Sequence, residues 1–130
     1  MQRACILVVA IAIAACAPTL AQAQQLIASY VARLSAADHF NSNGERLTSS
    51  AAAIIRQDRA NFHRFGIRDP EDEGDPFFAD QDNRAALEQM LERGRAAPGV
   101  IDRVVNGTPL VRVEIHRSGA GPFIIVTLIN

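Results

Sequence analysis

Histidine is the residue type in this sequence best suited to acid–base catalysis or zinc binding, and there are three: His39, His63 and His116. Either His39 or His63 could act as the general base of a small hydrolase. The surrounding pattern gives such an enzyme little support, because the sequence contains no HExxH zinc motif and no Gly-x-Ser-x-Gly elbow that would present a nucleophilic serine. We therefore expect a protein that is not an enzyme, with a small hydrolase as an alternative.

All 13 basic residues are arginines, and the sequence contains no lysine. This excludes Walker-type phosphate binding and Schiff-base chemistry, which require a lysine amine. Arg56, Arg59 and His63 recur at helical spacing and would share one face of a helix. Guanidinium groups bind carboxylate, phosphate or sulfate through paired hydrogen bonds, so these three residues form a candidate anion-binding site for an envelope polymer. The simpler alternative is a solvated helix face that pairs with nearby acidic residues.

Acidic residues alternate along a loop between two predicted helices. The candidate cation ligands are Asp69, Glu71, Glu73, Asp75 and Asp80. Counted from Asp69, Gly74 occupies the sixth position and Asp80 the twelfth, and this spacing resembles the calcium loop of an EF-hand. The loop departs from that pattern by its two prolines and by an aspartate at the twelfth position, which reaches less far than glutamate. A divalent-cation-binding module that takes Ca²⁺ is therefore an alternative to a solvated turn, and we expect no other cofactor.

The charges nearly cancel over the whole chain, with 14 acidic residues and a formal net charge of −1. This balance provides no general electrostatic attraction to nucleic acid or to an anionic membrane. Aromatic residues do not alternate with arginines in the way that builds a stacking surface for bases. We expect no nucleic-acid partner.

Apolar residues at helical spacing predict two or three helices in the part of the chain that carries these side chains. The first covers residues 26–34, and the second covers residues 50–65 and ends at Gly66, which suits a left-handed C-terminal position. The third begins at Asp80 or Asp82, either of which can cap it, and ends before Gly94.

The C-terminal part changes to the two-residue period of a β-strand. Val111, Val113 and Ile115 alternate with polar residues, and residues 123–129 form an apolar run. Residues 100–105 precede an Asn-Gly turn signal and are therefore a candidate for the strand before it. The expected fold is α+β: two or three N-terminal helices followed by a C-terminal antiparallel β-meander of two or three strands, in one small domain over residues 24–130. If the last strand lies at a sheet edge, it could pair with the same strand of a second copy, and the protein could then form a homodimer.

Residues 1–23 have the pattern of a secretory signal peptide. Arg3 precedes an apolar run over residues 4–15, and Ala21-Gln22-Ala23 matches a cleavage site. Cleavage after Ala23 removes both cysteines, Cys5 and Cys16, and leaves a soluble protein. Alternatively, Ile13-Ala14-Ala15-Cys16 resembles a bacterial lipobox, whose cleavage would leave Cys16 carrying a lipid anchor.

These observations together predict a non-enzymatic exported domain, periplasmic or secreted, that binds another envelope component. The partner would be an envelope protein or polymer, and the domain would meet a membrane only if Cys16 carries lipid. The expectation depends mainly on what the sequence lacks: a convincing catalytic set, a phosphate-binding loop and a complete metal-ligand set.

The mass of the mature protein from its native host distinguishes the two cleavage sites. We expect a polypeptide that begins at Gln24, because Ala21-Gln22-Ala23 is the better-formed site. Intact-mass spectrometry would contradict this expectation if it found a polypeptide beginning at Cys16 with the added mass of a lipid.

Overall fold

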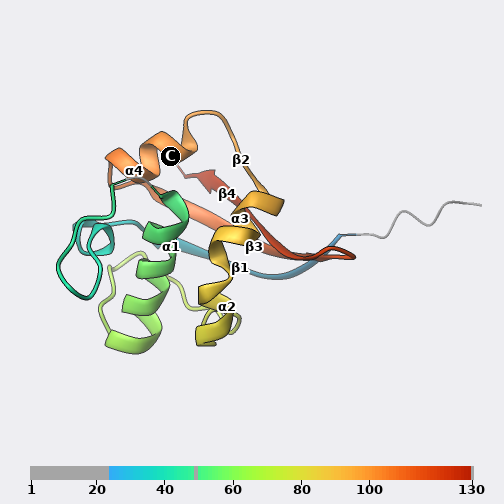
Figure 1. The fold of residues 1–130 in the computed structure, drawn as a ribbon, viewed down its shortest axis with the longest axis horizontal. Coiled ribbons are helices and arrows are strands. Elements are labelled where there is room, and N and C mark those ends of the chain that lie inside the picture. Colours follow the sequence, from blue (N-terminus) through green and yellow to red (C-terminus); the bar gives the residue numbers. More distant parts are fainter. Residues whose placement is uncertain (1–23, 49, 130) are drawn as a thin grey trace, which may run out of the picture.

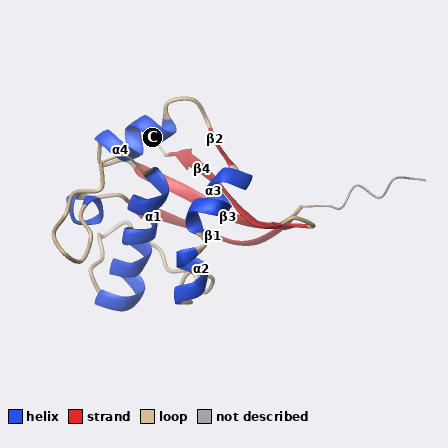
Figure 2. Ribbon diagram, in the orientation of Figure 1, coloured by secondary structure: helices blue, strands red, loops and turns tan. Residues whose placement is uncertain are grey.

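A four-stranded mixed sheet carries the helices of the described chain on one of its faces (Figure 1, Figure 2). The computed structural model describes residues 24–48 and 50–129; the expected signal peptide and Cys16 lie outside these ranges. The strands are β1 (Gln25–Arg33), β2 (Arg95–Ala96), β3 (Leu110–Ser118) and β4 (Gly121–Leu128), in the order β1-β3-β4-β2. The helices are α1 (Ala51–Ala60), α2 (Gln81–Ala85), α3 (Leu87–Arg93) and α4 (Val100–Asn106), with a 3₁₀ turn η1 (Ala36–His39) and a π-helical turn η2 (Asn61–Phe65).

The expected order of helices followed by a β-meander is wrong, because the described chain begins with a strand. Residues 26–34 were predicted to be helical, but residues 26–33 belong to β1, which pairs antiparallel with β3. Tyr30, Ala32 and Leu34 are fully buried at alternate positions, and Tyr30 lies opposite Val113. The helical pattern was misleading because small alanines fill inward positions of the strand, and because a β-bulge between Leu26 and Ala28 shifts the alternation.

A second correction concerns residues 100–105, which form most of helix α4 rather than a strand. Val100 and Val104, one helical turn apart, are buried against the core. Asn106 is the last residue of α4, and its Nδ2 donates a hydrogen bond to the Asp102 carboxylate at 2.8 Å. The Asn-Gly pair therefore ends a helix here instead of joining two strands. The sheet is mixed because the two-residue β2 pairs parallel with β4.

The remaining predicted elements are confirmed. Helix α1 begins after Ser50, whose side chain accepts a hydrogen bond from the Ala53 amide at 3.1 Å, and its continuation η2 ends at Gly66 with φ of 67°. Asp80 caps α2 through the Asp82 amide at 2.7 Å, and a short break separates α2 from α3. Strands β3 and β4 form the expected antiparallel hairpin.

The core lies between the sheet and the helices. Its members are apolar side chains that are at most 1% exposed, among them Ile54, Ile55, Leu87, Met90, Val111, Val113, Ile115, Ile124 and Val126. Burial of each large side chain is worth about 1.5–3 kcal/mol, which makes this layer the main source of stability. Within the described ranges, no helix is both long and apolar enough to cross a membrane.

Strand β4, at which a homodimer was possible if the strand lay at a sheet edge, is not the outermost strand. It lies between β3 and β2, although β2 covers only Ile125 and Val126. Gly94, at the end of α3, packs directly against the backbone of β4 at Ile124. This helix end and β2 together cover part of the β4 edge.

The close approach at Gly94 predicts a sensitive position. A methyl group added there would overlap the carbonyl oxygen of Ile124, and neither backbone can move without disturbing the sheet. We expect Gly94→Ala to lower the free energy of unfolding by about 3 kcal/mol, measured by urea denaturation. Gly74→Ala is the control, because its added methyl group would lie 3.4 Å from the Phe62 ring. Equal stability of the two variants would contradict the packing described here.

Candidate functional site

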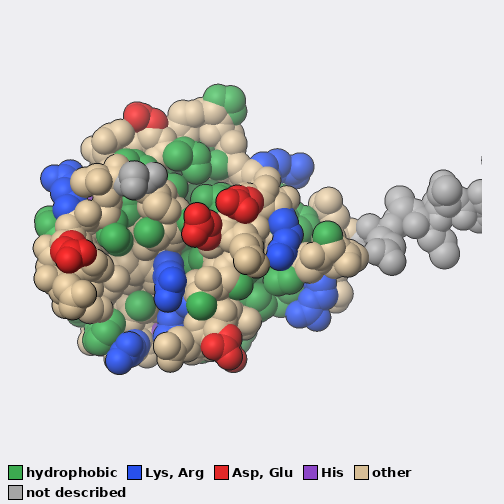
Figure 3. All heavy atoms as spheres, viewed as in Figure 1, with side chains coloured by type: hydrophobic (Ala, Val, Ile, Leu, Met, Phe, Trp, Pro, Cys, Tyr) green, Lys and Arg blue, Asp and Glu red, His purple; other side chains and the backbone are tan. Residues whose placement is uncertain are grey.

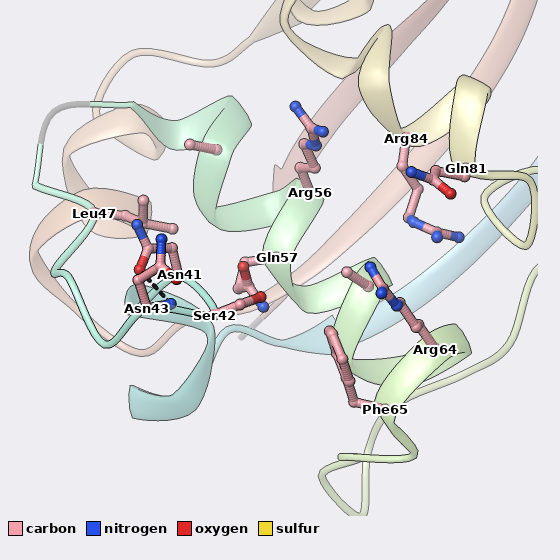
Figure 4. A pocket seen from close by; sticks show the side chains of 12 residues that line it. Asn41, Ser42, Asn43, Leu47, Arg56, Gln57, Arg64, Phe65, Gln81 and Arg84 are labelled. Atoms are coloured by element: carbon pink, nitrogen blue, oxygen red, sulfur yellow. Dashed lines mark hydrogen bonds between the residues drawn. The ribbon is translucent and has the colours of Figure 1, made fainter.

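A groove with a volume of about 360 Å³ crosses the outward side of α1, from residues 41–43 on one side to α2 on the other (Figure 4). Its side chains are mostly polar or positively charged, and none of the described residues that line it is acidic. They are Asn41, Ser42, Asn43, Leu47, Ala53, Arg56, Gln57, Ala60, Arg64, Phe65, Gln81 and Arg84. We call this site the cationic groove.

Three arginines from three elements give the groove its charge: Arg56 from α1, Arg64 from η2 and Arg84 from α2. Arg56 and Arg64 are two helical turns apart and exposed on the same side of the helix. Figure 4 shows Arg64 pointing toward Arg84 across the space between η2 and α2. Figure 3 shows basic side chains over α1 on this face, with acidic side chains nearby.

The three guanidinium groups differ in how firmly they are held. Arg84 is 7% exposed, and its Nη1 donates to the carbonyl oxygens of Phe78 and Ala79 at 2.7 and 3.1 Å. Within the described chain, Arg56 and Arg64 form no side-chain hydrogen bond or ion pair. Their like charges repel across the groove, and a bound anion would relieve that repulsion.

Of the predicted anion-binding residues, only Arg56 lies at this groove. Arg59 is fully buried on the other side of α1, where its Nε donates to Asp58 at 2.7 Å and its Nη1 donates to Asp75 at 3.0 Å. His63 Nε2 lies 3.1 Å from the same Asp75 oxygen. The structure thus separates Arg56 from Arg59 and His63. The spacing of Arg56 and Arg64 could have revealed their shared face, whereas nothing in the sequence connects Arg84 to them.

The buried cluster around Arg59 places two carboxyl groups against one guanidinium. The guanidinium also stacks on the Tyr30 ring, 3.9 Å from its centroid, and donates to the Glu73 carbonyl oxygen at 2.9 Å. Burial raises the pKa of Asp58 to about 7, although the positive charge of Arg59 opposes the shift. A neutral Asp58 leaves a balanced pair of Arg59 and Asp75, so the cluster stabilises the fold most when Asp58 is protonated.

A third buried carboxyl group belongs to Asp38 of η1. Asp38 accepts a hydrogen bond from Asn61 Nδ2 at 2.9 Å and another from the Ser35 amide at 3.0 Å. Its burial raises the pKa of the carboxyl group above its ordinary value, while both hydrogen bonds oppose the shift. Asp38 therefore links η1 to η2 as a structural contact.

Four of the five predicted cation ligands use their carboxylates in separate contacts within the protein. Asp75 binds Arg59, Asp80 caps α2, and Glu71 pairs with Arg33 at 3.2 Å. Glu73 accepts a hydrogen bond from the Val31 amide at 2.7 Å. Asp69 is held through its backbone, whose amide donates to the Asp72 carboxylate at 2.8 Å and whose carbonyl oxygen accepts from the Asp72 amide at 3.1 Å. In residues 24–48 and 50–129, no three His, Cys, Asp or Glu side chains group in a way that could hold a metal ion.

The acidic loop instead covers the outer edge of β1. The Glu73 amide donates to the Val31 carbonyl oxygen at 2.8 Å, and Asp72 accepts the Arg33 amide at 2.9 Å. These contacts satisfy backbone groups that an edge strand would otherwise present to another chain. Asp72 and Glu73 of the acidic loop thus cap this strand edge.

The three histidines lie in three different environments. His39 is buried, with Nδ1 2.7 Å from the Ser35 carbonyl oxygen and Nε2 2.9 Å from that of Val104, so it joins η1 to α4. His116 lies on β3, stacks on Phe123 and contacts Glu114 at 3.0 Å. His63 is bound to Asp75, as described above. Within the described chain, none of these rings contacts a serine, threonine or cysteine side chain, which a base-activated nucleophile would require.

The raised pKa of Asp58 predicts a pH dependence of stability. Because the folded pKa is about 7, above the ordinary value of 3.8, the stabilising effect is complete below pH 4 and is lost as the pH rises through 7. The contribution of Asp58 to the free energy of unfolding should fall by up to about 1.4 kcal/mol per pH unit over that range. In Asp58→Asn, this decrease in the free energy of unfolding should be absent, as measured by urea denaturation between pH 5 and pH 8.

The control for that experiment is Glu92→Gln, which changes an exposed carboxylate on α3. It should keep the pH dependence of the parent protein. A slope in Asp58→Asn equal to that of the parent would show that Asp58 does not titrate in this range.

No family model matches the chain, and no curated protein or solved structure shows significant similarity to it. The function is therefore argued from the groove and from the chemistry of its side chains.

Proposed function

We propose that this protein is a non-enzymatic exported domain that binds an anionic component of the cell envelope in its cationic groove. The observation that carries the proposal is the meeting of Arg56, Arg64 and Arg84 at one groove, with no acidic residue among the described residues that line it. The ligand would carry several carboxylate, phosphate or sulfate groups, as an anionic polymer or an acidic protein segment does.

The groove combines a fixed anion-binding group with two adjustable ones. Arg84 is held by two backbone carbonyl oxygens, so its remaining donors are oriented before a ligand arrives. Arg56 and Arg64 are exposed and can adjust to the spacing of charges along a flexible ligand. Each guanidinium can donate two parallel hydrogen bonds to one anionic group.

Two features support a binding role over catalysis. The described lining of the groove contains no His, Asp, Glu or Cys that could act as a general base or a nucleophile. His39 and His63, the candidates for a small hydrolase, are engaged with backbone carbonyl oxygens and with Asp75 respectively.

Export to the envelope is supported by the signal-like pattern of residues 1–23.

Binding should depend on the groove arginines and on salt. We expect poly-L-glutamate and dextran sulfate to bind the protein in calorimetric titrations, with an affinity that falls as the salt concentration rises. Arg56→Gln combined with Arg64→Gln should weaken binding at least about tenfold, because each charge-assisted hydrogen bond contributes about 1.5–3 kcal/mol.

A double variant on β3, Arg112→Gln with Arg117→Gln, is the matched control, because it removes the same charge from exposed positions outside the groove. It should bind both polymers like the parent protein. Equal weakening in the two double variants, or no binding by the parent protein, would refute a specific role for the groove.

A further inference from the structure

A second hollow, of about 280 Å³, adjoins the cationic groove. It contains three large apolar side chains that are unusually exposed: Phe40 at 41%, Phe65 at 44% and Ile67 at 52%. We call these three residues the apolar shelf. Exposed apolar side chains that gather in one hollow mark a binding surface more often than single ones do.

The shelf and the groove form one continuous surface. Four residues line both hollows: Asn41, Ser42, Gln57 and Phe65. At the junction, the guanidinium of Arg64 lies over the Phe65 ring, 5.0 Å from its centroid. A ligand that reaches from one hollow into the other would therefore meet positive charge and apolar surface in direct succession.

From this juxtaposition we infer that the ligand is an acidic peptide segment of a partner protein, with an apolar side chain beside its carboxylates. The inference rests on the proposed function and specifies its ligand. The carboxylates would lie against Arg56, Arg64 and Arg84, and the apolar side chain would cover Phe40, Phe65 and Ile67. An extended peptide suits this geometry because its successive side chains project in different directions.

Two other anionic ligands match only part of this surface. A charged polysaccharide supplies anionic groups but no large apolar side chain to cover the shelf. An anionic bilayer supplies phosphates and hydrocarbon, but a bilayer is broad and flat, and both features of this surface are hollows. The charge of the groove therefore selects an acidic partner, and the adjoining shelf selects a peptide.

A pair of synthetic peptides tests the inference: a short oligoglutamate with one central phenylalanine, and the same peptide with serine at that position. We expect the phenylalanine peptide to bind the parent protein about tenfold more tightly in calorimetric titrations. Phe65→Ser combined with Ile67→Ser should remove this difference. Phe40→Ser provides an independent test if the double variant does not fold, as judged by its circular dichroism.

The matched control is Leu26→Ser with Ile101→Ser, which replaces two exposed apolar residues away from both hollows, 54% and 43% exposed. It should keep the preference for the phenylalanine peptide. If both peptides bind the parent equally and Arg56→Gln with Arg64→Gln weakens them, the proposed anion binding stands and the peptide inference is overturned. If neither peptide nor the two polymers binds, the proposed function itself fails.

Phosphatidylglycerol vesicles provide the remaining comparison, in a sedimentation assay. We expect no binding that depends on the shelf. If vesicles bind through Phe65 and Ile67 while the phenylalanine peptide does not bind, the ligand is a membrane surface and the peptide inference is wrong.

Discussion

Arg59 imposes the strongest constraint on this fold, because its guanidinium is completely buried and its charge must be balanced there. Asp75 supplies the opposite charge, Asp58 accepts a hydrogen bond from the Arg59 Nε, and the Tyr30 ring supplies a stacking surface. These partners come from α1, from the acidic loop and from β1. One buried charge therefore fixes the rotation of α1 about its axis and its position against the sheet.

This rotation determines which arginines reach solvent. With Arg59 turned inward, Arg56 and Arg64 lie on the outward side of the same helix and line the groove. The acidic loop is occupied elsewhere, since its carboxylates balance Arg59 and cover the edge of β1. The groove thus keeps a positive charge in a chain whose formal net charge is −1. A charge imbalance of this kind is local, and the overall composition conceals it.

The sequence was sufficient for the elements whose periodicity is regular: the helices over residues 50–65 and 80–93, and the hairpin of β3 and β4. It was insufficient for β1, because Ala28 and Ala32 are too small to mark the inward face of a strand and the bulge breaks the alternation. It also could not identify Arg59 as buried, because an arginine on a helix is ordinarily solvated. The place of Arg84 in the groove depends on the packing of α2 beside α1, which no local pattern encodes.

The central claim is that Arg56, Arg64 and Arg84 form one anion-binding groove, and its most direct test is a map of where an anion binds. The measurement is a titration of the isotope-labelled protein with oligoglutamate, followed through the arginine Nε–Hε resonances by nuclear magnetic resonance. The account predicts saturable shifts at these three arginines, while the resonances of Arg112 and Arg117 stay in place. Shifts of similar size at all exposed arginines, or none at the groove, would contradict it.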